Sequence, residues 1–489
     1  MGPHPELAAL SATDLSRLLA RGELTSMELV EMSLRRIAAL DEGNTRAVIE
    51  VNPDAVDIAQ RSDQARRRGR VRGPLHGLPL LVKDNIDSGD RMLTTAGSLA
   101  MTGAPAVRDA PLVARLRRAG AVLIGKSNLS EWANARSTRS ASGWSGRGRQ
   151  TRNPHVLDRT PSGSSSGSGV SAAAGYAAIT IGTETDGSIV SPASMNGVVG
   201  LKPGVGVVSQ AGIIPIAASQ DSAGPMTRTV EDAAMVLAAI ATRPADYAGA
   251  LRKGALRGRR LGILREPFNG YSEHTDKCYE SALEALREGG SVLVEVEFEG
   301  AKELRGSQVE RTILLHELKA GLNDYLRTRR GLAVRTLAGV IRWNRTHAAE
   351  EMPYFRQEFF EKAQATRGLR DKAYLEARAT ALRLARTEGI DRLMRKHRLA
   401  ALVAPSGAPA CMIDQVGGDK FLGGSTQPAA VAGYPIITVP AGDAFGLPLG
   451  LSFFAGPGSE ARLLGLAFAF EQATNARRVP KFLPTLDLP

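Results

Sequence analysis

Two turns rich in serine and glycine lie in the first half of the chain and carry residue types suited to nucleophilic catalysis. The later turn contains Asp186-Gly187-Ser188 and is followed by Ser191-Pro192, a pair typical of a helix N-cap and first turn. A turn of this kind can direct several backbone N–H groups at one point beside Ser188 Oγ. This is the arrangement that an oxyanion hole requires, so the pattern predicts Ser188 as a candidate nucleophile.

A serine nucleophile needs a base, and the histidines are poorly placed to provide one. The last of them, His397, lies in a basic helical run. Lys83 is the alternative, because it ends the apolar run Leu78–Val82 and is therefore expected to be partly buried. Removal from water lowers the pKa of a lysine and leaves a neutral amine that can accept a proton. A single lysine at a strand end is more often a surface residue with a buried stem, so Lys83 is a candidate only together with the serine motifs.

The earlier turn, Pro161–Gly169, has the composition of a flexible linker. However, it leads directly into a run of small residues, Val170–Gly175, and then into the apolar run Tyr176–Ile181, a pattern that indicates a tightly packed helix and a buried strand. We therefore expect this segment to lead into the protein core rather than to link two domains. The stretch Gly163–Gly167 also satisfies G-x-S-x-G, but the nucleophile elbow of α/β-hydrolases requires a late histidine, and none follows His397.

The segment Gly120–Ser127 satisfies G-x4-G-K-[ST], the pattern of a phosphate-binding loop. That loop requires a strand before the first glycine and an open loop between the glycines. In this chain the intervening residues Ala121–Ile124 are themselves an apolar strand, and Val113–Ala119 before them has a helical pattern. Because backbone N–H groups that bond within a sheet cannot bind a phosphate, we predict no nucleotide site.

The elements that must position these residues follow from hydrophobic patterns. The spacing Thr25–Glu28 is that of a capping box, and Asn52-Pro53 is typical of a cap and first-turn proline, so the chain is expected to begin with helices. Further apolar runs predict strands at Leu78–Val82, Ala121–Ile124, Tyr176–Ile181, Leu402–Ala404 and Ile436–Val439, with a helix near Ala461–Thr474.

This order predicts an α/β fold with a central mixed β-sheet covered by helices on both faces. The chain leaves the sheet pattern and later returns to it, which favours one domain over 1–489 rather than several domains in a row. Its expected parts are N-terminal helices (1–70), a core that holds the motifs (71–250), a mostly helical insertion (260–400) and a return to the sheet (401–489).

Composition excludes several classes of protein. The 489 residues are 43% hydrophobic, which is enough for a large packed core. Cys278 and Cys411 provide neither a disulfide framework nor a CxxC metal site. The N-terminus lacks the pattern of a signal peptide, and no apolar stretch is long enough to cross a membrane. We therefore expect a cytoplasmic protein without membrane contact.

The formal net charge is +12, and arginines cluster at Arg66–Arg68, Arg257–Arg260 and Arg395–Arg398. This charge raises nucleic-acid binding as an alternative. A platform for single strands also needs aromatic residues, which make up only 5% of the chain and are not interleaved with the clusters. We therefore interpret the clusters as solvated helix faces and ends, and we expect no nucleic-acid partner.

Taken together, the motifs resemble the amidase-signature enzymes, a family that uses a Ser–cis-Ser–Lys triad. The matching segments are Gly77–Asn85, Gly125–Glu131, Pro161–Lys202 and Gly212–Ala233. The interval between Ser164 and Ser188 equals the one between the family's two catalytic serines. The resemblance implies that Ser188 is the acyl-enzyme nucleophile, that Ser164 is the bridging serine after a cis Gly163–Ser164 peptide, and that Lys83 is the general base.

The same resemblance assigns the oxyanion hole to Thr185, Asp186, Gly187 and Ser188. It also implies that Ser165 hydrogen-bonds around Lys83. The expected amidase-signature fold is the α/β fold described above, and the expected substrate is a small-molecule or peptide amide. No metal, no organic cofactor and no obligatory partner chain are implied.

The nucleophile motif departs from a pattern common in the family. Many members have Gly-Gly-Ser-Ile-Arg, whereas this chain has Asp186 and Val190 in place of the first glycine and the arginine. The glutamine-hydrolysing subunit of tRNA-dependent amidotransferases carries the common pattern, so that role loses support. The segments Gly182–Ile189, Ile213–Ile216 and His316–Asn323 instead resemble peptide amidases, which remove C-terminal amides from peptides.

Peptide-amidase-like hydrolysis is therefore the first hypothesis. A broad amidase or esterase that acts on aryl amides, small esters or carbamates is the alternative within the same class, because a carbamate carbonyl passes through the same tetrahedral oxyanion. A non-catalytic scaffold is a third class of hypothesis, and the intact set of Lys83, Ser164 and Ser188 argues against it.

Overall fold

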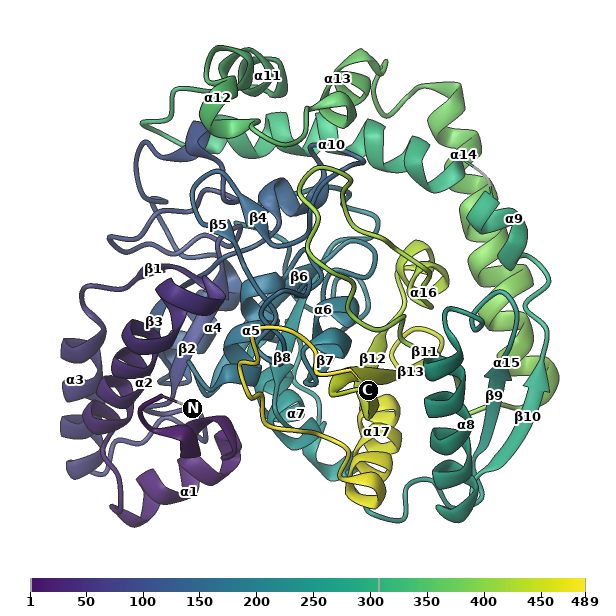
Figure 1. The fold of residues 1–489 in the computed structure, drawn as a ribbon, viewed down its shortest axis with the longest axis horizontal. Helices are drawn as coiled ribbons and strands as arrows, with labels where there is room; N and C mark the ends of the chain where they lie inside the picture. The colour runs from purple at the N-terminus through teal and green to yellow at the C-terminus, as the bar shows by residue number, and fades with distance from the viewer. Residues whose placement is uncertain (1, 307, 489) are drawn as a thin grey trace.

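The computed structural model describes residues 2–306 and 308–488, and eleven strands within these ranges form one sheet (Figure 1). In spatial order the strands are β1 (Val48–Val51), β3 (Val122–Ser127), β2 (Pro79–Lys83), β6 (Ile179–Glu184), β8 (Ser222–Thr227), β7 (Val199–Lys202), β12 (Ile436–Ala444), β13 (Leu447–Phe454), β11 (Ala401–Pro405), β9 (Arg260–Leu264) and β10 (Val292–Val296). A short hairpin, β4 (Trp144–Ser145) with β5 (Arg149–Gln150), lies outside it.

The sheet is mixed, as predicted. β2 pairs in parallel with both β3 and β6, and β9 pairs in parallel with β10 and β11, whereas the strands between these groups pair antiparallel. Every residue of β2, β3 and β6 is buried, which explains why their sequences are not alternating but almost continuously apolar.

The helices that accompany the sheet are α1 (Ala12–Arg21), α2 (Ser26–Leu40), α3 (Ala55–Arg67), α4 (Pro111–Arg118), α5 (Ser166–Ala174), α6 (Val190–Met195), α7 (Val230–Ile240), α8 (Glu273–Glu288), α9 (Ala301–Gly306), α10 (Val309–Thr328), α11 (Leu337–Thr346), α12 (Ala348–Glu351), α13 (Glu358–Ala365), α14 (Lys372–Leu382), α15 (Asp391–His397), α16 (Gln427–Ala432) and α17 (Glu460–Thr474). In the part of the chain that the structure describes, none of them is long and apolar enough to cross a membrane.

Helices cover both faces of the sheet, because alternate residues of each strand point to opposite sides. In β6, Ile179 and Ile181 join a core cluster that includes Leu237 of α7. Thr180, between them, points to the other side, where its Oγ1 donates a hydrogen bond to the carbonyl of Ser168 in α5 at 3.0 Å. The small residues of α5 allow this helix to lie close against β2 and β6, as their run in the sequence predicted.

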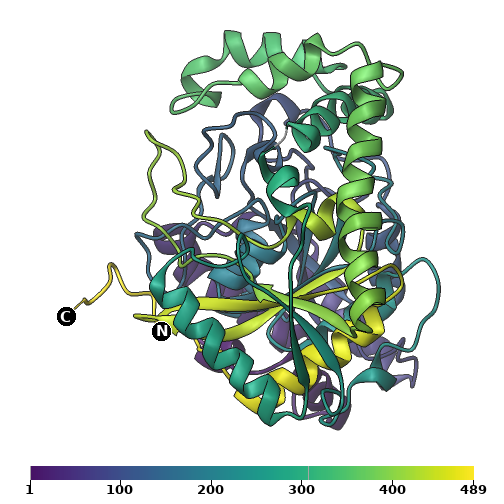
Figure 2. The same cartoon turned by 90° about the vertical axis from the view of Figure 1, so that its right-hand side faces the viewer.

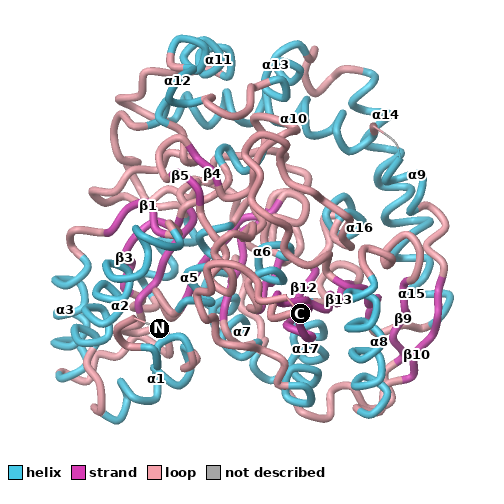
Figure 3. The backbone as a smooth tube through the Cα atoms, viewed as in Figure 1, coloured by secondary structure: helices cyan, strands magenta, loops and turns pink. Residues whose placement is uncertain are grey.

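Residues 260–400 contain most of the remaining helices, together with β9 and β10, which join the central sheet. Figure 1 shows α10, α11 and α13 above the sheet, and Figure 2 shows the green helix α14 running beside it. Between the sheet and α10 the chain consists mainly of loops (Figure 3). Segments from several parts of the sequence therefore meet in this region.

Two local predictions at helix starts have opposite outcomes. The capping box at Thr25 is confirmed, because Thr25 and Glu28 bond each other's backbone N–H at the start of α2. The predicted cap at Asn52-Pro53 is wrong, since α3 begins at Ala55 after Asp54. The reason is that the Asn52 amide donates to the carbonyl of Leu123 in β3 at 2.7 Å, so Asn52 is held by the sheet.

The strand predicted within the segment Gly120–Ser127 is confirmed. Residues Val122–Ser127 form β3, and α4 ends at Arg118 before them. The backbone groups of this segment bond to β1 and β2 on either side, so they are engaged in the sheet rather than in an open loop.

Candidate active site

Lys83 lies at the carboxyl end of β2, in the interior of the sheet, and its side chain is completely buried rather than partly buried as predicted. Its Nζ lies 2.7 Å from Ser164 Oγ and 3.0 Å from Ser165 Oγ. It also lies 2.9 Å from Thr183 Oγ1, in the adjacent strand β6. Burial lowers the pKa of Lys83 well below its ordinary value, although the charges of Glu184 and Asp221 oppose this effect. The structure thus brings Lys83 and Ser164 together, as the resemblance implies.

The peptide bond between Gly163 and Ser164 is cis, as expected. Apart from Lys83 Nζ, which contacts both, the two serines that follow Gly163 have different partners. The carbonyl of Ser164 accepts a hydrogen bond from Ser130 N at 3.1 Å. Ser165 Oγ accepts one from Thr183 N at 3.1 Å and donates one to the carbonyl of Thr183 at 2.9 Å. Ser165 therefore fastens the start of α5 to β6 beside the lysine.

Ser188 is held next to these serines by the backbone, because Ser165 N donates to the carbonyl of Ser188 at 3.1 Å. Unlike Lys83 and Ser164, it is slightly accessible, with 9% of its surface exposed. In the described residues no hydrogen bond joins Ser188 Oγ to Ser164 Oγ. The structure therefore brings the three predicted residues into one site but does not close the last link of the relay.

The turn before Ser188 presents free backbone donors. Among the described residues, the N–H groups of Asp186, Gly187 and Ser188 donate to no protein acceptor. Gly187 has a φ of +79°, in the left-handed region, which glycine adopts without strain. Three consecutive N–H groups are thus available to an oxyanion beside Ser188.

The helix after this turn does not start at Ser191-Pro192 as predicted. α6 begins at Val190, because Glu184 Oε2 accepts hydrogen bonds from Ile189 N at 2.7 Å and Val190 N at 2.9 Å. A carboxylate at the end of β6 thus caps the helix N-terminus, where negative charge is stabilised.

Side chains from distant segments hold the turn, and the sequence alone did not indicate them. Thr185 Oγ1 donates to Asp221 Oδ1 at 2.6 Å, and Thr426 Oγ1 donates to Asp186 Oδ1 at 2.6 Å. Burial of the carboxyl group, together with the nearby charge of Glu310 in α10, raises the pKa of Asp186 well above its ordinary value.

Glu310 itself is fixed by two amides. Its Oε1 accepts from Gln220 Nε2 and its Oε2 accepts from Gln427 Nε2, each at 2.8 Å. The Gln220 amide also lies 3.3 Å from the carbonyl of Thr185. Asp186 stands where many family members have glycine. In this protein its carboxyl belongs to a polar network that joins the turn to α10 and α16.

A small cavity of about 30 Å³ lies beside Ser164. One part of its wall is polar, with Asn85, Thr183 and Thr185, and another is apolar, formed by the segment Ile213–Ile216. Asp221 also lines the cavity, and burial raises its pKa to about 6. The wall segment is held in place because Asp221 Oδ2 accepts hydrogen bonds from Ile216 N at 2.9 Å and Ala217 N at 3.0 Å.

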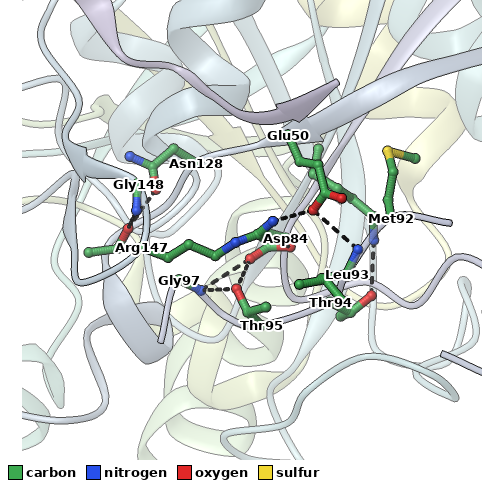
Figure 4. Close-up of polar contacts among 12 residues, drawn as sticks. Glu50, Asp84, Met92, Leu93, Thr94, Thr95, Gly97, Asn128, Arg147 and Gly148 are labelled. Carbon is green, nitrogen blue, oxygen red and sulfur yellow. Dashed lines mark hydrogen bonds and ion pairs between the residues drawn. The ribbon is translucent and has the colours of Figure 1, made fainter. Parts of the chain in front are cut away.

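Behind Lys83 lies a second polar network, which is shown in Figure 4. Asp84 is completely buried and accepts hydrogen bonds from the Thr95 hydroxyl and from Gly97 N. Arg147 lies 3.6 Å from Asp84 Oδ1 and forms an ion pair with Glu50 of β1. Burial raises the pKa of Asp84, while the charge of Arg147 opposes the shift. This network fixes the backbone immediately after Lys83.

The described residues contain no group of three or more His, Cys, Asp and Glu side chains arranged to hold a metal ion. The groups that the site offers for chemistry are the lysine, the serines and the backbone donors described above.

Comparison with known proteins agrees with this geometry. Residues 28–464 match the family model Amidase. A protein of Arabidopsis thaliana named probable amidase is 41% identical over 484 residues, which cover 94% of this chain and 89% of that protein. A putative amidase of Schizosaccharomyces pombe is 33% identical over 532 residues, covering 98% of this chain and 88% of that protein.

Among solved structures, the native peptide amidase from Stenotrophomonas maltophilia superposes with a TM-score of 0.92 and is 50% identical, with 96% of this chain and 98% of that chain covered. The family resemblance and the expected α/β fold are thereby confirmed. The chain belongs to the amidase family, in its amidase-signature fold, and is an enzyme that hydrolyses amides.

Proposed function

We propose that this enzyme is a peptide-amidase-like serine hydrolase, which converts a C-terminal carboxamide to the free acid and ammonia through an acyl-enzyme on Ser188. The observation that carries the proposal is the contact of Lys83 Nζ with Ser164 Oγ at 2.7 Å, in a completely buried setting beside a turn with free N–H donors. A buried amine with a lowered pKa is a proton acceptor, and the free N–H groups can stabilise an oxyanion.

The proposed reaction moves one proton along the triad. The neutral amine of Lys83 takes the proton of Ser164 as Ser164 takes that of Ser188. Ser188 Oγ then forms a bond to the amide carbon, and the carbonyl oxygen becomes an oxyanion facing the N–H groups of the turn. The C–N bond breaks as the proton returns through Ser164 to the leaving nitrogen, which departs as ammonia, and water then hydrolyses the ester.

This relay requires Ser188 Oγ to approach Ser164 Oγ when substrate binds. Such a tightening is common, since hydrogen bonds between catalytic groups are often long or absent before the substrate is present. All groups of the proposed triad and oxyanion hole belong to this chain, so the proposed reaction needs no partner chain, ATP or metal.

The cavity beside Ser164 supports a peptide amide over glutamine. Its apolar wall, Ile213–Ile216, offers no counter-charge to the α-carboxylate of a free amino acid. Asp221, the one acidic side chain among the described residues that line it, is already engaged with backbone N–H groups and with Thr185. The 50% identity to a peptide amidase points the same way.

The test is a panel assay on the purified chain alone, with ammonia release measured for peptide amides, their free acids as blanks, and glutamine. Anilides, small esters and carbamates are followed in parallel by release of their leaving groups. We expect ammonia from peptide amides and little from glutamine. Rapid cleavage of anilides or carbamates without ammonia from any peptide amide would instead favour the broad amidase or esterase.

A further inference from the structure

Two of the basic clusters in the sequence meet at one place on the protein surface. Gly258–Arg260, which leads into β9, and Arg398–Ala400, which leads into β11, line a hollow together with Arg462 of α17. A second hollow, between the 249–255 segment and α17, shares Arg259 and Arg462 with the first. We call these two adjoining hollows the arginine groove.

The groove has an excess of positive charge. Its arginines are Arg252, Arg259, Arg260, Arg398 and Arg462, all exposed, and no Asp or Glu of the described chain lines either hollow. The nearby carboxylate of Asp246 accepts a hydrogen bond from the N–H of Gly249, which lines the second hollow. Arg260 Nε donates to the carbonyl of His397 at 2.9 Å. Within the described residues, the other four guanidinium groups make no hydrogen bond and no ion pair.

At the opposite end of β9, in contrast, the charge of an arginine is neutralised by carboxylates. Arg265, directly after the strand, pairs with both Glu280 and Glu295. The arginines of the groove come from four separate parts of the chain and converge on a concave surface, where their charges add. Such a surface attracts anions.

We propose that the arginine groove binds a small polyphosphate anion. A guanidinium group presents paired N–H donors that match two oxygens of a phosphate, and several such groups suit a chain of phosphates. The space within the two hollows, about 490 and 650 Å³, leaves room for several phosphate groups. No aromatic side chain of the described chain lines them, so stacking of nucleic-acid bases has no platform there.

The groove and the active site use different residues. None of the residues that line the groove also lines the cavity beside Ser164. Anion binding is therefore separable from turnover, and this proposal does not depend on the proposed function. Because a bound polyphosphate would join the segments before β9 and β11 to α17, it should stabilise the folded protein.

The experiment compares the full chain with two double variants by titration calorimetry and thermal unfolding. Arg259→Gln with Arg462→Gln removes the charges shared by both hollows. Arg342→Gln with Arg370→Gln removes the same charge from exposed arginines outside the groove, which serve as the control. The ligands are sodium tripolyphosphate and, at matched ionic strength, sodium sulfate.

We expect tripolyphosphate to bind more tightly than sulfate and to raise the unfolding temperature of the unmodified chain. The groove variant should lose at least tenfold in affinity, the control variant less than twofold, and both should hydrolyse substrate at the normal rate. Equal losses in both variants would overturn the proposal. So would an absence of tripolyphosphate binding to the unmodified chain.

Discussion

Replacement of Lys83 by methionine tests the proposed base, because methionine keeps the apolar stem and removes the amine. The structure allows the cost in stability to be worked out contact by contact. Ser165 Oγ keeps both of its contacts with Thr183, and Thr183 Oγ1 keeps the Asn85 amide at 3.0 Å. All three side-chain oxygens lose their contact with the amine, but among the described residues Ser164 Oγ alone is left without any side-chain partner.

One buried hydroxyl without a partner costs about 1–3 kcal/mol. A folded protein is typically stable by about 5–15 kcal/mol, so Lys83→Met should remain almost entirely folded. Removal of a buried amine offsets part of the loss, since the amine itself is costly to desolvate. A fall in kcat of about 10²–10⁴-fold, the range typical of a lost general base, therefore cannot come from unfolding.

The pH dependence provides a second measurement on the same variant. Because burial lowers the pKa of Lys83, the neutral amine is populated at a lower pH than for a free lysine. The kcat of the unmodified enzyme should rise with pH as Lys83 loses its proton, and the residual activity of Lys83→Met should lack this rise. Between the folded and unfolded pKa values the unfolded chain binds more protons, so Lys83 makes stability increase with pH in that window, and the variant should lose this increase.

The assay is initial rates of ammonia release across pH, normalised to folded protein measured by circular dichroism, with unfolding in urea alongside. Lys126→Met is the matched control, since Lys126 is equally buried in the neighbouring strand but contacts Ile86 and Thr94 instead of serines. It should reduce stability, because Asp84 and Asp87 lose an opposing charge, yet keep the pH profile. A Lys83→Met enzyme that keeps a tenth of the normal kcat, or the same rise with pH, would refute a base at Lys83.

Other substitutions test the rest of the site. Ser188→Ala should abolish turnover and labelling by a fluorophosphonate probe, since no acyl-enzyme can form; retained labelling would point to another serine. Thr426→Val removes the donor to Asp186 and should lower kcat about tenfold, less than the 10²–10³-fold for loss of a direct oxyanion donor. In urea unfolding it should cost about 1–3 kcal/mol, because the buried Asp186 carboxyl loses this hydrogen bond. Asp84→Ala leaves the buried Thr95 hydroxyl without its carboxylate acceptor and should cost about 1–3 kcal/mol in urea unfolding, whereas an unchanged midpoint would contradict the anchoring role.

The sequence by itself determined the features that depend on local pattern. Apolar runs predicted β2, β3 and β6 to within a few residues, because strands buried on both faces need continuous apolar side chains. The capping box at Thr25 depends on residues within one helical turn, and it was predicted correctly. The candidate residues Lys83, Ser164 and Ser188 were found because each lies in a short motif with a recognisable spacing.

Tertiary structure decided which groups surround these residues. Thr183 contacts Lys83 only because β2 and β6 are neighbours in the sheet, and Glu310 reaches the turn at Asp186 only because α10 folds over it. The start of α6 was predicted wrongly for a related reason: its cap is Glu184, at the end of the preceding strand. No local pattern marks contacts of this kind.

The arginine clusters also show the difference between what the sequence determines and what the tertiary structure decides. From the sequence, Arg257–Arg260 and Arg395–Arg398 were interpreted as solvated helix faces and ends. The structure places the second cluster at the end of α15, but the first lies in a turn and at the start of β9. The fold brings parts of both beside Arg462 and, among the described residues, places no carboxylate in the hollow that they line. The electrostatic interaction between two charges depends on their distance in space, and the order of residues along a chain does not fix that distance. For this reason the structure alone determined where this protein concentrates positive charge.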